Sequence, residues 1–153
     1  MGYMNNFNGY EKRERKFLNW YINLKSEHKL EEESAIGSYE RNDFVMLSGR
    51  TYVMGEIKIR TFEWDKYPTA VLELDKVEAL VDKFQSYHQM GQTNKLYYYA
   101  VYPKSRTILI FDIMTSPGTL TYEWCPITTA KDKGYKWKAM MNYKLKDAIK
   151  INY

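Results

Sequence analysis

The chain has 153 residues, enough for one hydrophobic core, and its 44% hydrophobic and 27% charged residues are ordinary for a globular protein. Its one cysteine, Cys125, excludes an intrachain disulfide and a cysteine-based zinc site, and no apolar run reaches the ~20 residues needed to cross a bilayer. The net charge of +4 permits an anionic partner without requiring one. We therefore expect a single domain over residues 1–153, located in the cytoplasm, or in the host cytoplasm if the protein is viral.

Two helices are indicated by the spacing of apolar residues. Within about residues 11–33, the apolar residues from Phe17 to Leu24 recur at i, i+3, i+4 and i+7, which is one face of a helix. Further along, Asp75 and Glu78 form a capping-box pattern ahead of a second apolar stripe. This second helix is expected to run to about residue 90, because Gly91 is a typical stop signal.

The remaining predicted elements are strands rich in aromatic and β-branched residues. Turn signals at 48–50 and 103–106 join them into two hairpins, and a loop is expected over 61–69. The order of helix, hairpin, helix, hairpin and strand-rich tail predicts an α/β (α+β) domain with a central sheet. The expected strands cover 43–47, 51–60, 95–102, 107–114, 119–124 and 135–145.

The last of these strands alternates apolar and basic residues, so one face is expected to be aromatic and the other wet and basic. From residue 131 to 150 seven lysines stand against two aspartates, which gives +7 − 2 = +5. Such a face can follow the phosphates of a nucleic acid, or it can protect an edge strand against aggregation. The sequence leaves both readings open for Lys136, Lys138 and Lys144.

The strand at 51–60 carries charged side chains in an otherwise apolar run. Because side chains alternate along a strand, Glu56, Lys58 and Arg60 share one face. The preceding hairpin turn brings Asp43 opposite the middle of this strand, and directly opposed residues have Cβ atoms only ~5 Å apart. Asp43 and Glu56 can therefore converge on one point.

Two carboxylates at that distance repel one another unless a cation lies between them. Mg²⁺ suits such a site, since it binds one or two carboxylates, keeps several waters and accepts phosphate oxygens. It can also lower the pKa of a bound water, which Lys58 could orient or help to deprotonate. These residues together predict hydrolysis of a phosphodiester. A Glu and a Lys two positions apart also occur as a simple solvated pair, so this motif alone is weak.

The segment from Asn42 to Arg60 resembles the core of the PD-(D/E)xK nucleases, most of all small members such as archaeal-type Holliday junction resolvases and virus-type recombination nucleases. The resemblance covers about residues 11–114 and implies a restriction-endonuclease-like central mixed sheet flanked by helices. Residues 115–153 would form a basic, strand-rich extension. Asn42 replaces the usual proline, and the strand that normally precedes the Asp would be short or displaced, because only residues 34–42 are available for it.

This resemblance implies a role for each residue. Asp43 and Glu56 would bind Mg²⁺ or Mn²⁺ with the backbone carbonyl of Ile57, Lys58 would serve the water, and Glu33 or Glu40 would add an acidic ligand. Arg60, Lys76, Lys136, Lys138 and Lys144 are the candidates for contact with nucleic acid, DNA above RNA.

The expected function is an endonuclease with structure-selective or non-specific cleavage, because no separate specificity domain is visible. A homodimer or a larger nucleoprotein complex would fit such an enzyme. The alternative is a catalytically inactive member of the same fold that serves as a nucleic-acid-binding or structural component of a viral or replication complex. A module that binds proteins through its aromatic faces is a third reading.

Overall fold

The computed structural model describes residues 12–21, 23, 28–33, 44–86, 93–116, 118–127 and 134–153, and every structural statement below concerns these residues. An N-terminal helix covers residues 12–21, and none of the described helices is long and apolar enough to cross a membrane. The other elements are β1 (His28–Glu33), β2 (Phe44–Ser48), β3 (Thr51–Ile59), β4 (Thr69–Glu73), α2 (Leu74–Ser86), β5 (Thr93–Tyr102), η1 (Pro103–Ser105), β6 (Thr107–Asp112), β7 (Thr119–Pro126), β8 (Tyr135–Lys144), η2 (Leu145–Asp147) and β9 (Ile149–Asn152).

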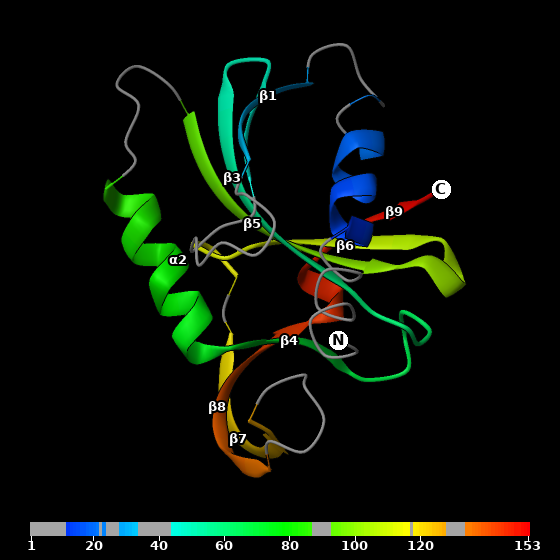
Figure 1. The fold of residues 1–153 in the computed structure, drawn as a ribbon, viewed down its shortest axis with the longest axis vertical. Helices are drawn as coiled ribbons and strands as arrows, with labels where there is room; N and C mark the ends of the chain where they lie inside the picture. Colours follow the sequence, from blue (N-terminus) through cyan, green and yellow to red (C-terminus); the bar gives the residue numbers. More distant parts are fainter. Residues whose placement is uncertain are drawn as a thin grey trace.

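A six-stranded sheet in the order β1-β2-β3-β5-β6-β9 forms the centre of the molecule (Figure 1). Only β3 and β5 run parallel, and the chain passes between them through β4 and α2. All other neighbours in this sheet are antiparallel, so the sheet is mixed. A smaller antiparallel sheet of β4, β8 and β7 lies beside it. The expected mixed α+β architecture with flanking helices is confirmed.

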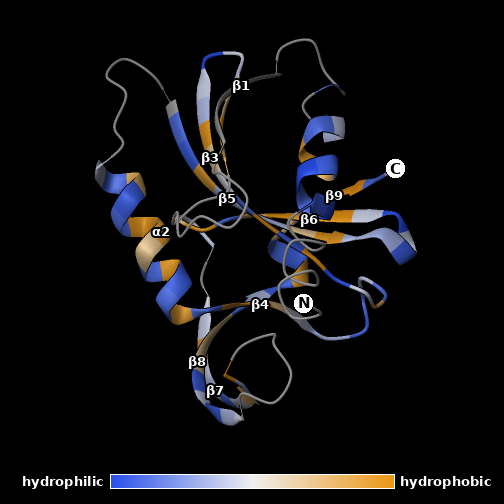
Figure 2. Cartoon of the chain, in the orientation of Figure 1, coloured by the Kyte–Doolittle hydropathy of each residue, from blue (hydrophilic) through white to orange (hydrophobic). Residues whose placement is uncertain are grey.

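Each face of the main sheet packs against one helix. One apolar cluster joins residues such as Met54, Tyr98 and Phe111 to Leu80 of α2. The other joins alternate residues of the same strands, including Ile57, to Leu18 of the N-terminal helix. Figure 2 shows the corresponding apolar stretches where the central strands cross. Because both faces are covered, the middle of the sheet is mostly apolar, and a charged residue there needs a partner.

The predicted hairpin between β2 and β3 is confirmed. Ser48 pairs with Thr51 across a two-residue turn, and Gly49 adopts a φ of 62° that such a turn favours. The register continues to the pair of Phe44 and Gly55, where the described part of β2 ends. This pair fixes the position of the residue that follows, Glu56, at the centre of the sheet.

The prediction of one helix over 11–33 is wrong at residues 28–33. Residues 28–33 form β1, which pairs antiparallel with β2, although their sequence HKLEEE has little strand character. The ladder with β2 supplies hydrogen bonds that outweigh this local preference. The strand that seemed short or displaced is thus β1, and it lies earlier in the chain than the expected 34–42.

The second helix begins one residue earlier than expected, at Leu74. Asp75 therefore lies in the first turn, where its charge still favours the helix N-terminus, instead of forming the cap. The described helix extends to Ser86, and the expected end near residue 90 lies outside the described residues.

Two strands were missed, β4 and β9. β4 begins at the last residue of the expected loop, its residues 70–73 were given no element, and it pairs with β8. β9 pairs with β6 at the edge of the main sheet, so the C-terminal residues 115–153 contribute to both sheets. Each strand has only four or five residues, too few for a period of two to be visible.

Candidate active site

Glu56 lies on β3 in the centre of the main sheet, with only 2% of its surface exposed. Two ammonium groups approach its carboxylate: Lys76 Nζ is 3.2 Å from Oε2 and Lys58 Nζ is 3.6 Å from Oε1. A buried charge is tolerated only where such partners compensate for its lost hydration. Glu56, Lys58 and Lys76 therefore form a charged cluster whose carboxylate lies in the interior of the sheet.

The alternation predicted for β3 is confirmed by the contacts of its residues. Val53 and Ile57 belong to the cluster under the N-terminal helix, whereas Met54 belongs to the cluster under α2 and Glu56 meets Lys76 of α2. Lys58 shares the face of Glu56 and is 40% exposed. Glu56 and Lys58 therefore form the inner and outer parts of one site. A substrate that touches Lys58 from solvent would come close to a carboxylate that is itself shielded from water.

Lys76 comes from the first turns of α2, 20 residues after Glu56 in the sequence. Its neighbour Val77 is buried against the sheet, and this anchors the helix so that Lys76 reaches the carboxylate. The sequence suggested Lys76 as a residue for contact with phosphate. In the structure its ammonium group forms an ion pair with the Glu56 carboxylate. Of the two cations, it is the nearer to the carboxylate and the less exposed, at 28%.

Arg60 directly follows β3 and is partly buried. Its Nη2 donates to the carbonyl of Val71 at 2.8 Å and to the Tyr98 hydroxyl at 3.2 Å, while that hydroxyl also donates to Val71. Burial acts to lower the pKa of Arg60, but Tyr98, Tyr102 and Glu14 outweigh it and the pKa is raised. Arg60 thus keeps its charge while it joins β3 to β4.

Glu14 of the N-terminal helix is an acidic residue that sequence reasoning passed over. It is half-buried and close enough to Arg60 to raise its pKa. Glu14 precedes the buried Leu18 by four residues, so it shares the inward side of the helix, and this spacing was the available signal. Among the described residues, no group of three or more acidic, His or Cys side chains converges on one point.

Several predicted site residues cannot be placed in this cluster. Asp43 and Glu40 lie outside the described residues, and so does the side chain of Glu33. The backbone of Glu33 ends β1 opposite Phe44 of β2. The structure thus leaves the predicted acidic partner of Glu56 untested.

The lysines predicted for nucleic-acid contact on β8 lie in the smaller sheet. Lys136 and Lys144 are exposed, but Lys138 is only 12% exposed and its Nζ is 2.8 Å from Glu73. The expected wet face is confirmed at Lys136 and Lys144 but not along the whole strand, because Met140 on that face is 8% exposed. On the aromatic face Tyr143 is buried, whereas Trp137 is 66% exposed.

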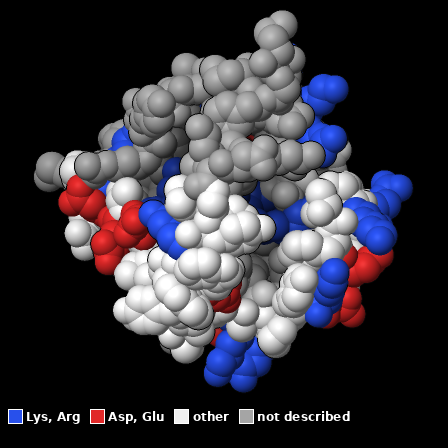
Figure 3. Space-filling model, turned by 60° about the horizontal axis from the view of Figure 1, so that its bottom comes forward, with Lys and Arg blue, Asp and Glu red and all other residues white. Residues whose placement is uncertain are grey.

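The reason is that β4 pairs only with residues 140–144 of β8, whereas the outer half pairs with β7 alone. The outer half therefore carries aromatic side chains on an open face. Figure 3, with the end that carries β7 and β8 turned forward, shows largely uncharged surface with Lys and Arg at its margins. The large exposed apolar residues of these two strands are Leu120, Tyr122, Trp124, Tyr135 and Trp137.

The fold is similar to a known nuclease structure. No protein-family model matches the chain, and no curated protein matches its sequence. Among solved structures, it is similar to Hjc, a Holliday junction resolvase from the archaeal hyperthermophile Archaeoglobus fulgidus, with a TM-score of 0.57 and 16% identity over 92% of this chain and 91% of that one. At this identity the likeness shows the fold, and the expected nuclease-type fold is confirmed.

Proposed function

We propose that the protein is a metal-dependent nuclease of the PD-(D/E)xK type that cleaves DNA, with branched or otherwise structured DNA as its preferred substrate. The observation that carries this proposal is the buried Glu56 carboxylate, which meets Lys58 and Lys76 on the fold of a Holliday junction resolvase. A buried acid flanked by cations on an apolar sheet is costly for stability alone, so a role in chemistry accounts for it better.

The donor set fits Mg²⁺ or Mn²⁺. Glu56 supplies hard carboxylate oxygens in a site shielded from water. Asp43 is joined to Phe44, whose partner Gly55 directly precedes Glu56, and consecutive Cα atoms are only ~3.8 Å apart. If this register continues by one residue, Asp43 stands opposite Glu56, and Asp43 is proposed as the second carboxylate. The backbone carbonyl of Ile57 is proposed as a further ligand, and Glu14 joins Glu33 and Glu40 as a candidate for an additional acid.

The side chains in the cluster have separate roles in this proposal. A bound Mg²⁺ would supply an acidified water and charge stabilisation at the phosphate. Lys58, at the outer part of the site, orients the attacking water or holds the scissile phosphate. Lys76 compensates for the charge of Glu56, and its ammonium group can turn to a phosphate oxygen when that charge is otherwise balanced.

The test is cleavage of three labelled DNAs, a four-way junction, a duplex and a single strand, with Mg²⁺, Mn²⁺ or chelator. We expect metal-dependent cutting that Glu56→Gln and Asp43→Asn each reduce at least ~100-fold, since each would remove a metal ligand. Glu78→Gln, an exposed carboxylate on α2, is the matched control and should cut normally. Full activity of Glu56→Gln would refute the site, and binding without cutting by every protein would favour the non-catalytic alternative.

A further inference from the structure

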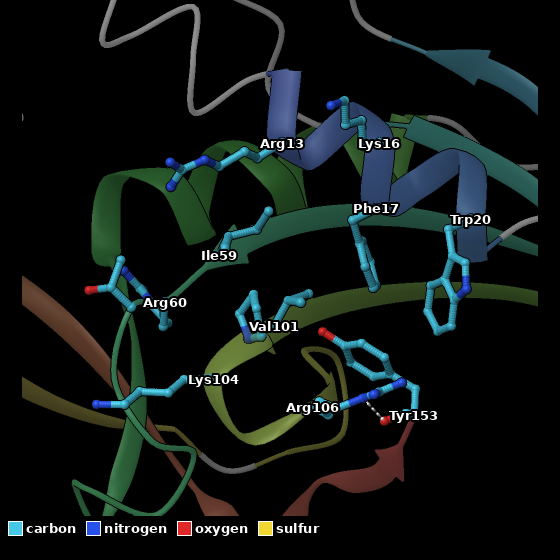
Figure 4. Close-up of a pocket in the computed structure, with 12 residues that line it drawn as sticks. Arg13, Lys16, Phe17, Trp20, Ile59, Arg60, Val101, Lys104, Arg106 and Tyr153 are labelled. Atoms are coloured by element: carbon cyan, nitrogen blue, oxygen red, sulfur yellow. Dashed lines mark hydrogen bonds between the residues drawn. The ribbon is translucent and has the colours of Figure 1, made fainter.

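A groove of about 800 Å³ opens on the sheet face under the N-terminal helix, between that helix, the end of β3, η1 and Tyr153 (Figure 4). Its apolar floor includes Ile59 and Val101, and aromatic rings stand along it. Its size falls in the range of sites that enclose a small organic molecule. The proposed cleavage site uses none of this floor.

The charged side chains that line the groove have one sign. The cationic side chains that line it come from three separate parts of the chain, and no acidic residue is among the described residues that line it. Glu14 lies on the same helix but does not line the groove. Anionic ligands are therefore favoured, and the region is a focus of positive potential. The lining cations are Arg13, Lys16, Arg60, Lys104 and Arg106.

The aromatic residues of the groove form a connected row. The ring centroids of Phe17 and Trp20 are 5.9 Å apart, and those of Trp20 and Tyr153 are 4.9 Å apart. Trp20 is 37% exposed, so one part of its ring is available to a ligand. Figure 4 shows Phe17 and Trp20 pointing from the helix toward the groove, with Arg13, Arg60 and Lys104 at one end and Arg106 with Tyr153 at the other.

Arg106 has a strained backbone that serves this arrangement. Its φ of 50° makes it the one non-glycine residue with a positive φ in the described part of the chain. This conformation costs about 1 kcal/mol or more, and glycine or asparagine would adopt it more easily. The arginine side chain makes contacts that glycine or asparagine could not make. Its Nε donates to the main-chain oxygen of Tyr153 at 2.6 Å, and its guanidinium lies 5.8 Å from the Tyr153 ring.

From these observations we infer that the groove binds a single-stranded segment of nucleic acid, with a base on the aromatic row and phosphates on the cations at the Arg60 end. Aromatic rings combined with cations are the chemistry of single-strand binding, because every base has a stacking face and every phosphate a charge. The inference rests on the proposed function, since it makes the preferred substrate a DNA with an unpaired strand next to the cut.

The groove opens on the face of the sheet under the N-terminal helix, opposite the face of Glu56 and Lys58. Arg60 follows β3 directly and lines the groove, so it lies where the two faces meet at the end of the strand. The distance from Glu56 to Arg60 along the chain is about 13 Å. A single strand that leaves the cleavage site would therefore pass around the end of β3 to reach the groove.

The experiment measures binding of the whole protein to three fluorescent DNAs in chelator: a thymidine single strand, a blunt duplex and the same duplex with a single-stranded flap. Binding is followed by fluorescence anisotropy at low salt, so it does not depend on cleavage. The variants are Lys104→Glu for the cationic end and Trp20→Phe and Trp20→Ala for the aromatic row. Lys146→Glu is the matched control, since Lys146 is exposed on η2 and outside the groove.

We expect the single strand and the flap to bind more tightly than the blunt duplex, with a loss of about tenfold in Lys104→Glu and Trp20→Ala. Trp20→Phe should retain most of the affinity, which separates stacking from a folding defect. Lys146→Glu should change affinity less than threefold.

Equal loss in Lys104→Glu and Lys146→Glu, or no preference for the unpaired strand, would overturn the inference whether or not the protein cuts DNA. Groove-dependent binding with no cleavage under any metal would leave the groove intact and refute the nuclease. The two proposals therefore fail separately.

Discussion

At the scale of single residues, the ion pair between Lys76 and Glu56 compensates for the burial of a negative charge. The carboxylate is 2% exposed, and the 3.2 Å approach of Lys76 is closer than that of Lys58. Lys58 is 40% exposed, so solvent weakens its share of the interaction. The lysine on α2 is therefore the principal compensation for the buried charge.

We predict that Lys76→Gln lowers the free energy of unfolding by roughly 1–3 kcal/mol in chelator, because it removes the nearer of two cations from a buried charge. The same variant should gain more stability from Mg²⁺ than the wild type, since the cation replaces the missing charge. Urea unfolding with and without Mg²⁺ measures both. In the Glu56→Gln background, Lys76→Gln should cost much less, and an equal cost in both backgrounds would show that the contact carries little energy.

Buried tyrosines with raised pKa values are expected to lower the stability of the protein at high pH. Burial, together with Tyr21 and Tyr97, raises the pKa of Tyr99 well above its ordinary value of 10.0, and burial raises the pKa of Tyr143 to about 12. Each hydroxyl stays protonated in the folded state over a range where the unfolded chain ionises. Their contribution is fully present below pH 10 and is lost as the pH rises through the folded pKa.

We therefore predict that the free energy of unfolding is flat up to about pH 9 and falls between pH 10 and 12. Tyr143→Phe should make the fall shallower by up to about 3 kcal/mol at its upper end, because a gap of two pKa units corresponds to that energy. Unfolding curves in urea across this range provide the measurement. Tyr122→Phe, at a position 66% exposed, is the control, and an unchanged slope in Tyr143→Phe would contradict the prediction.

At the scale of elements, the β2–β3 hairpin carries the candidate site, and its end is fixed by one aromatic ring. Phe44 pairs with Gly55 and its ring lies over the glycine, where an added Cβ would overlap it. The same ring packs on Tyr99 with 5.6 Å between centroids. The residues on either side of this pair are Asp43 and Glu56. Glycine at position 55 is thus required by close packing beside the proposed ligands.

We predict that Gly55→Ala destabilises the protein by about 1–3 kcal/mol, because the added Cβ would overlap the Phe44 ring, which is itself buried and packed on Tyr99. Cleavage should fall at least tenfold, since the pair next to both carboxylates shifts. A smaller side chain at position 44 should make room for the added methyl group. Phe44→Leu in the Gly55→Ala protein should therefore restore part of the stability. Thermal unfolding and the junction assay provide the readouts. If the single and double variants are equally unstable, the overlap is not the cause.

At the scale of the whole molecule, the outer part of β7 and β8 presents an open aromatic face. Trp124 and Trp137 are 58% and 66% exposed and their ring centroids are 5.5 Å apart. Tyr135 stacks on Trp124 from the same side. Contiguous exposed rings of this kind are typical of interaction surfaces and are unusual on an isolated protein. We therefore propose this face as the interface of the homodimer that the sequence led us to expect.

We predict concentration-dependent self-association that the double change Trp124→Ser and Trp137→Ser weakens, because it removes the largest exposed rings. Sedimentation velocity over a range of concentrations gives the measurement, and circular dichroism checks that the fold is retained. A wild-type protein that stays monomeric at every concentration would contradict the prediction and remove this face as the dimer interface.

The sequence by itself determined the local features of this protein. The period of two in residues 51–60 fixed the shared face of Glu56 and Lys58, and the turn at Gly49 fixed the hairpin, because alternation and turn dihedrals depend on neighbours in the chain. The similarity to the resolvase fold agrees with the architecture expected from this motif. The acidic partner Asp43 remains a prediction.

Only the tertiary structure decided which segments and charges meet. Residues 28–33 are a strand because β2 offers them a ladder, and the outer half of β8 is open because β4 ends before it. Lys76 reaches Glu56 through the docking of α2, and the groove joins residues from Arg13 to Tyr153. Such contacts depend on partners distant in sequence, and local periodicity carries no information about them.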